Sequence, residues 1–183
     1  TISTNSCHAV APPDGGAPLG LLVQWTCHPE AMGSRNTLVT ADFVAATVAK
    51  LTTQFGCPVA YFSGAVGGLM APPDGLIRDG QGKILEEGDF AYSDGYGAAV
   101  ASLAAQAVIA AEPVRLTPFA VASKRLAVPV ENKLYRAARS LGVLKRAGWE
   151  WTGDAEKFAA PHAGGDSKAL LAVETEVACV ELG

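Results

Sequence analysis

The 183-residue sequence has few charged side chains, few aromatic side chains and no run of like charges that would form a tail. Charged residues make up 17% and apolar residues 49% of the chain, which is the composition of a globular protein and excludes a disordered one. The formal net charge is −4. Nucleic-acid-binding domains present a basic face, so this balance argues against a nucleic-acid partner.

Long apolar runs are also missing, so no membrane-spanning segment is expected. The most apolar stretch, residues 98–111, is short and is followed by Glu112 and Pro113, which predicts a buried helix in a globular domain. The chain opens on Thr1 rather than Met, without a secretory signal, and we therefore expect a fragment or a processed product.

Cysteine and histidine are scarce and lie in no metal-binding motif. The four cysteines include no CxxC pair, so a disulfide scaffold or a zinc ribbon is not expected. The three histidines, His8, His28 and His162, lack the spacing of HExxH or HxH. The cysteines are expected to act as small apolar side chains.

Apolar periodicity predicts strands and helices that alternate along the first two thirds of the chain. Strands are expected at residues 7–11, 19–25, 58–62, 117–128 and 169–182. Helices are expected at residues 42–55, 92–111 and 132–146. This alternation predicts an α/β fold with a mixed β-sheet flanked by helices. We expect residues 1–183 to form a single domain, part of a larger catalytic domain.

His28 is the best candidate for a functional side chain. It follows the apolar strand of residues 19–25, and α/β folds place ligand-binding groups at strand ends. An imidazole there can bind zinc through one ring nitrogen while a neighbouring group orients the other. Asn36 and Asp42 follow closely and are candidates for that orienting role. Alternatively, Asp42 caps the next helix and Asn36 lies in a turn.

A glycine-rich turn, SGAVGG, follows the strand at residues 58–62. The backbone N–H groups of Gly67 and Gly68 are candidates for stabilising a developing oxyanion. The turn matches neither GxGxxG nor a P-loop, and a tight buried turn explains it equally well.

Residues 23–43 (VQWTCHPEAMGSRNTLVTADF) and 57–72 (CPVAYFSGAVGGLMAP) resemble the neutral/alkaline ceramidase family. In that family an apolar strand ends in a His-containing element, which is followed by an Asn-x-Leu-Val/Ile-Ser-x-Asp stretch, a helix, a strand and a small-residue turn. The segments VENKLY and VETEV further along are similar to bacterial members. The resemblance covers most of the chain, although only residues 28–42 are specific.

The resemblance implies zinc-dependent hydrolysis of an N-acyl amide bond, with zinc as the cofactor and His28 as one ligand. It also implies a small amide or lipid-like substrate, the remainder of a parent chain as partner and an extracytoplasmic location. The family's other zinc ligands lie upstream, in a His-x-His-like element, and downstream, on a Glu and a Tyr. Met70 stands at or near the family's serine and lacks its hydroxyl, which argues against ceramide itself as the substrate.

Two other functions stay open at this point. A non-catalytic binding or structural module on the same fold would explain Met70. An N-terminal-nucleophile hydrolase would use the hydroxyl of Thr1 as nucleophile and its free amine as base. The sequence gives neither the substrate nor the oligomeric state.

Overall fold

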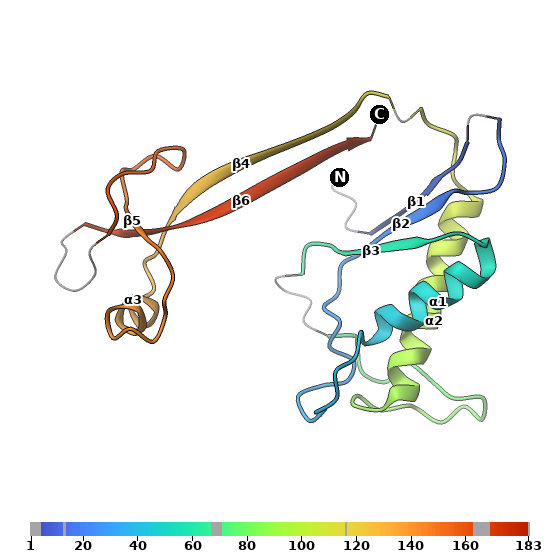
Figure 1. Cartoon of the computed structure of the whole chain (residues 1–183). Helices are drawn as coiled ribbons and strands as arrows, with labels where there is room; N and C mark the ends of the chain where they lie inside the picture. The colour runs from blue at the N-terminus through green and yellow to red at the C-terminus, as the bar shows by residue number, and fades with distance from the viewer. Residues whose placement is uncertain (1–4, 13, 67–70, 116, 163–168, 183) are drawn as a thin grey trace. The chain divides into compact units, whose positions relative to one another are not determined.

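The computed structural model describes residues 5–12, 14–66, 71–115, 117–162 and 169–182 (Figure 1). The chain divides into two compact units, Thr1–Glu112 and Pro113–Gly183. Each unit has its own small β-sheet, one mixed and one antiparallel, and the chain has helices in both. The prediction of an α/β fold with a mixed sheet and flanking helices is confirmed. A single domain over residues 1–183 stays a prediction.

The sheet of the first unit has the strand order β1-β2-β3. Strand β1 (Ser6–Val10) pairs antiparallel with β2 (Gly20–Trp25), and β2 pairs parallel with β3 (Val59–Ser63). The expected hairpin and both apolar strands are therefore present within one or two residues of their predicted bounds. Because β2 and β3 are parallel, the segments that follow them leave the sheet at the same edge.

Two helices pack against each other on one face of this sheet (Figure 1). They are α1 (Phe43–Phe55) and α2 (Phe90–Ile109). In β2 the side chains of Leu21 and Val23 are 1% exposed, whereas Leu22 between them is only half-buried. This alternation identifies the helix-covered face as the core of the unit.

A glycine in α2 allows the two helices to approach closely. A Cβ on Gly97 would lie 2.3 Å from the carbonyl oxygen of Phe43 and 2.8 Å from Cβ of Ala46. The hydroxyl of Thr47, in α1, donates across this contact to the carbonyl of Gly97 at 3.0 Å. Gly97 is thus a packing position, although glycine is unfavourable in a helix interior.

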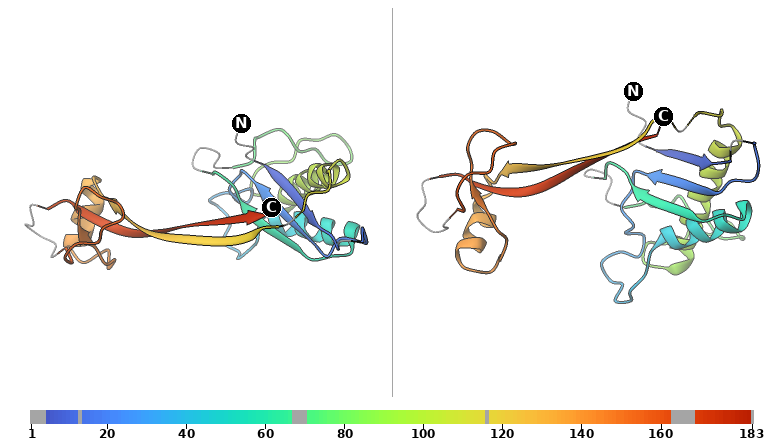
Figure 2. Two further views of the ribbon diagram at one scale, coloured as in Figure 1. Left: turned by 90° about the horizontal axis from the view of Figure 1, so that it is seen from above. Right: turned by 45° about the horizontal axis from the view of Figure 1, so that its top comes forward.

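The second unit is built on an antiparallel ribbon, shown from two further directions in Figure 2. Strands β4 (Phe119–Pro129) and β6 (Leu171–Leu182) pair along their length, and the short β5 (Trp149–Glu150) adds to β6. The helix α3 (Lys133–Ser140) follows β4. The buried residues of the second unit gather near β5 and include Ala127, Leu171, Ala172 and His162.

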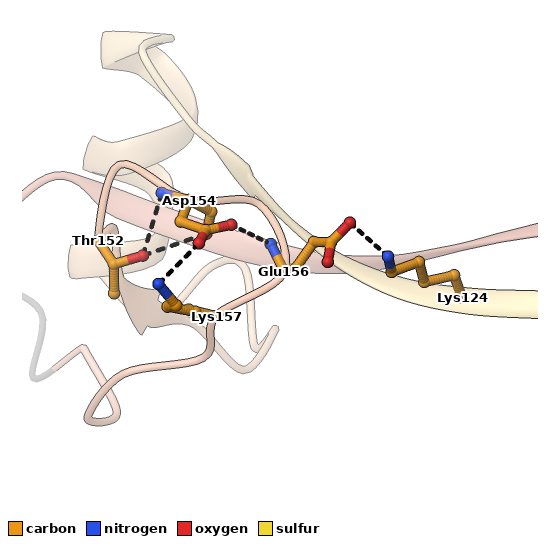
Figure 3. A network of polar contacts seen from close by, with 5 residues as sticks. All are labelled: Lys124, Thr152, Asp154, Glu156 and Lys157. Carbon is orange, nitrogen blue, oxygen red and sulfur yellow. Dashed lines mark hydrogen bonds and ion pairs between the residues drawn. The ribbon is translucent and has the colours of Figure 1, made fainter.

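Polar contacts fix the loop that follows β5, as Figure 3 shows. The backbone N–H of Glu156 donates to the carboxylate of Asp154 at 2.9 Å, and Lys157 Nζ lies 3.0 Å from the same carboxylate. Lys124 on β4 forms an ion pair with Glu156. These contacts lower the pKa of Asp154, first through the backbone N–H of Glu156 and then through Lys157.

Two expectations need correction. Asn132 caps α3, and the helix ends at Ser140 instead of residue 146, because Gly142 turns the chain with φ 74°. All four cysteines are free, and Cys27 and Cys57 are buried, whereas Cys179 is exposed and does not act as a core side chain. Within the described residues, no helix is long and apolar enough to cross a bilayer.

Candidate functional site

The segments that follow β2 and β3 begin side by side at one edge of the sheet. Trp25, the last residue of β2, is paired with Ser63, the last residue of β3. The backbone N–H of Gly64 then donates to the carbonyl of Trp25 at 2.9 Å. The start of the glycine-rich turn therefore lies against the strand end from which His28 follows.

His28 lies three residues beyond the end of β2, with 32% of its side chain exposed. Its Nδ1 atom is 4.0 Å from Oε1 of Glu30, a contact that is an ion pair only when the imidazole is protonated. The ring is thus neither packed inside an apolar interior nor fully in solvent. It is placed where a ligand could reach it while its backbone is held by the protein.

A chain of buried polar groups fixes the backbone of His28. Trp25 Nε1 donates to the hydroxyl of Tyr96 at 3.1 Å, and that hydroxyl is hydrogen-bonded to the thiol of Cys27. The thiol donates in turn to the carbonyl oxygen of His28 at 3.4 Å. The same carbonyl accepts from the backbone N–H of Glu30 at 2.9 Å. Donor and acceptor alternate along this relay, which favours one arrangement of the turn.

Burial dominates the electrostatics of these groups. It raises the pKa of the Cys27 thiol and raises the pKa of Tyr96 to about 12. It also raises the pKa of Tyr61, whose buried hydroxyl has no hydrogen-bond partner among the described residues. These groups stay neutral at physiological pH, so none of them is a charged nucleophile or base, and Cys27 and Tyr96 serve as hydrogen-bonding groups.

Asp42 clamps the loop that carries His28. It is 6% exposed, and its carboxylate accepts from three backbone N–H groups, those of Ala31 at 3.0 Å, Met32 at 2.9 Å and Phe43 at 2.7 Å. The last of these caps α1, as one alternative reading of the sequence expected. The first two hold the loop, and no described contact joins Asp42 to the imidazole of His28.

Asn36 folds its side chain back onto its own turn. Its Nδ2 donates to the carbonyl of Leu38 at 2.9 Å, and its Oδ1 accepts from the N–H of the same residue at 3.0 Å. Both ends of the amide are therefore occupied locally, which matches the turn reading. A role for Asn36 or Asp42 in orienting His28 or a bound water stays a prediction.

Several predicted site residues lie outside the described part of the chain. They are Thr1, Gly67, Gly68 and Met70. The structure therefore does not test the oxyanion role of Gly67 and Gly68, nor the comparison of Met70 with the serine of the ceramidase family. The described part of the turn, residues 64–66, is at the correct sheet edge.

A cleft of about 460 Å³ opens beside the clamped loop. Its walls come from residues 32–35 on one side and from residues 74–75 and 84–88 on the other. Gly33 permits the close approach of the walls, because a Cβ there would lie 2.6 Å from Oε1 of Glu87. His28, Asn36 and Asp42 do not line this cleft.

The metal-binding capacity of the described residues is limited. They contain no group of three or more His, Cys, Asp or Glu side chains that could hold a metal ion. The exposed imidazole of His28 fits one ligand of a zinc site, since zinc in proteins is usually bound by four groups. Of the other two histidines, His8 is exposed on β1, and the ring of His162 is bound to the carbonyl of Ala169 at 3.0 Å.

Sequence reasoning missed the relay of Trp25, Tyr96 and Cys27. Trp25 and Cys27 flank the strand end within three residues of His28, which was the available signal. Tyr96 comes from α2, about 70 residues further along, and only the packing of α2 on the sheet brings it there.

The mixed sheet, with helices on one face and a candidate ligand residue at the ends of parallel strands, belongs to the α/β class in which sites form at that edge. Among solved structures, the chain is similar to neutral ceramidase from Pseudomonas aeruginosa, with a TM-score of 0.60 and 13% sequence identity. The match covers 97% of this chain and 32% of the ceramidase, so the chain spans about a third of that protein's length. At this identity the likeness establishes the fold.

No protein-family model matches the sequence, and no curated protein matches it.

Proposed function

We propose that the chain is part of a zinc-dependent hydrolase that cleaves N-acyl amide bonds, with His28 as one zinc ligand. The observation that carries the proposal is the position of His28. Its imidazole, one-third exposed, follows a strand end whose parallel neighbour leads into the glycine-rich turn, in a fold similar to that of a neutral ceramidase. The remaining ligands would come from the rest of a longer chain.

The residues that surround the loop of His28 support this proposal. Asp42 holds the loop at Ala31 and Met32, while the relay that ends at Cys27 fixes the carbonyl of His28. With the backbone held at both points, the imidazole extends from a fixed position in the loop. Zinc, when bound, supplies the Lewis acid that polarises the amide carbonyl and activates water.

The substrate that fits the proposal is a linear N-acyl amide with a lipid-like acyl chain. This class follows from the ceramidase likeness and not from a described pocket, because His28 does not line the 460 Å³ cleft. The non-catalytic alternative uses the same fold without zinc.

Zinc content of the full protein that carries this chain tests the proposal. Metal is measured by mass spectrometry in the purified wild type, in His28→Ala and in His8→Ala. We expect about one zinc per chain in the wild type and in His8→Ala, and little in His28→Ala. His8 is the matched control because it is an exposed histidine on the neighbouring strand β1.

Stoichiometric zinc in His28→Ala would remove His28 from the ligand set. Absence of zinc from all three proteins, after dialysis against zinc, would favour the non-catalytic module. Hydrolysis of N-acyl amides of graded chain length then tests the reaction separately, because a protein that binds zinc at His28 and cleaves none of them refutes only the substrate class.

A further inference from the structure

Residues 132–149, which include α3 and the turn after it, hold an unusual share of the positive charge. The segment contains five of the chain's 14 Lys and Arg residues and no Asp or Glu, in a protein whose net charge is −4. The five are Lys133, Arg136, Arg139, Lys145 and Arg146. None of them forms an ion pair with a carboxylate within the described ranges.

The same segment exposes large aliphatic side chains. Leu134 is 82% exposed, Leu141 is 80% exposed and Val143 is 73% exposed. Leu134 and Leu141 are seven residues apart, which places them on the same face of a helix. Lys133, the first residue of the helix, and Lys145, beyond its end, are also exposed. We call these five residues the leucine–lysine patch.

The adjacent side of α3 explains why the leucines point outward. Tyr135 and Ala138 are half-buried, and the guanidinium of Arg139 donates to the carbonyls of Arg146 at 3.1 Å and His162 at 3.2 Å. Arg139 thus anchors the helix to the loops beneath it. A rotation of the helix that buried the leucines would break these contacts of Arg139.

The turn that carries Leu141 and Val143 is held in place by its backbone. Gly142, with φ 74°, follows the helix, and its N–H donates to the carbonyl of Arg139 at 3.0 Å. The N–H of Val143 donates to the carbonyl of Ala138 at 2.9 Å. This pair of bonds is the Schellman motif, a stable helix end. The patch therefore exists before any partner arrives.

We propose that the leucine–lysine patch docks the protein on an anionic lipid surface. A surface of this kind offers negative headgroups to the lysines and an apolar layer to the leucines, and helices that combine both features lie in the interface of a bilayer. Nucleic acid would satisfy the charges but would leave three large aliphatic side chains in water. The charge pattern therefore favours lipid. This docking does not depend on zinc or on His28.

Vesicle flotation of the 183-residue chain tests the proposal. The chain is mixed with vesicles of phosphatidylcholine alone, or with about 30% phosphatidylglycerol added to supply the negative surface. We expect binding to the anionic vesicles that weakens as salt rises from about 0.1 M to about 0.5 M. Leu134→Ser combined with Leu141→Ser is expected to lower the partition coefficient at least about tenfold. Lys133→Gln combined with Lys145→Gln is expected to lower it about fivefold for each lysine.

Matched controls come from the first unit. Leu103 and Ile109 on α2 are 50% and 75% exposed, and Lys50 and Lys83 are exposed lysines. Replacing them by Ser and by Gln, respectively, should leave binding unchanged. Circular dichroism confirms that each variant is folded, and the salt dependence of the wild type tests the electrostatic part without any substitution.

Three outcomes would overturn the proposal. The first is no binding of the wild type to anionic vesicles, and the second is equal binding to neutral and anionic vesicles. The third is that the patch variants bind as well as the controls. Self-association of the wild type that the leucine variant abolishes, without vesicle binding, would assign the patch to a protein interface instead.

Discussion

The clamp formed by Asp42 gives the sharpest test of how the sequence builds the candidate site. Its carboxylate accepts three backbone hydrogen bonds while 6% exposed, and it does so with a positive φ of 55°. In Asp42→Ala the three donors lose their acceptor. At about 1.5 kcal/mol for each bond to a charged group, the free energy of unfolding should fall by about 4.5 kcal/mol.

Two further substitutions separate the loss of the hydrogen bonds from the strain of the positive φ. Asp42→Asn can keep Oδ1, which serves Ala31 and Phe43, but it turns an amide NH₂ toward the N–H of Met32. We expect it to cost about 2 kcal/mol. Asp42→Gly loses all three bonds but tolerates the positive φ, so it should be about 1 kcal/mol less destabilised than Asp42→Ala.

Urea unfolding measures these differences. In a background with Trp149→Phe and Trp151→Phe, the fluorescence of Trp25 reports on the first unit alone, since Trp25 is its one tryptophan. Amide hydrogen exchange at Ala31 and Met32 should rise in Asp42→Ala. If Asp42→Ala lies within about 0.5 kcal/mol of the wild type, the carboxylate does not hold the loop and the reasoning fails.

Three further predictions follow from the packing and the charges. Gly97→Ala should lower the stability of the first unit by about 2 kcal/mol, measured by urea unfolding, because the added Cβ would meet the carbonyl of Phe43 at 2.3 Å and outweigh the better helix propensity. Burial raises the pKa of Tyr96 from 10.0 to about 12, so its contribution to stability is complete below pH 10 and is lost as the pH rises toward 12. Tyr96→Phe should flatten alkaline unfolding in that range, and an unchanged slope would contradict this. The hydrogen bond from Arg125 lowers the pKa of Glu174, so the contribution of this carboxylate to stability is present above the ordinary Glu pKa of 4.5 and is lost as the pH falls through the lower pKa of the folded state. Glu174→Gln should therefore weaken the acid dependence of unfolding in the second unit, and a wild-type pH profile would refute the pairing.

Local patterns predicted the elements of the first unit well, because each pattern had a physical origin in the folded state. The apolar run at residues 19–25 is β2, and Asp42 and Gly56 mark the ends of α1 as cap residues do. Gly97 lies inside α2 although glycine is unfavourable in a helix interior, because its role is in the contact with α1 and not in its own helix. Such a contact joins segments about 50 residues apart and leaves no local signal.

Of the candidate site, only the position of His28 was predictable from the sequence. The rule that α/β folds place ligand-binding side chains after strand ends pointed to His28. The structure places this residue after the end of β2, with about one-third of its side chain exposed. The supporting relay needed Tyr96, which only the packing of α2 supplies. The side chains of Asn36 and Asp42 were expected near the imidazole, yet the described hydrogen bonds tie them to the backbone of their own loop.

The helix α3 shows why an amphipathic pattern does not by itself define the buried face. The spacing predicts Leu134, Tyr135, Ala138, Leu141 and Leu144 on one apolar face, but this arc is wide, and on α3 only its Tyr135–Ala138 side is half-buried. The half-buried Arg139 helps to fix this orientation, because its guanidinium donates to two backbone carbonyls in neighbouring loops. The guanidinium of Arg139 thus faces the neighbouring loops, whereas Leu134 and Leu141 face solvent. This inversion of the usual pattern produces the surface that we propose binds lipid.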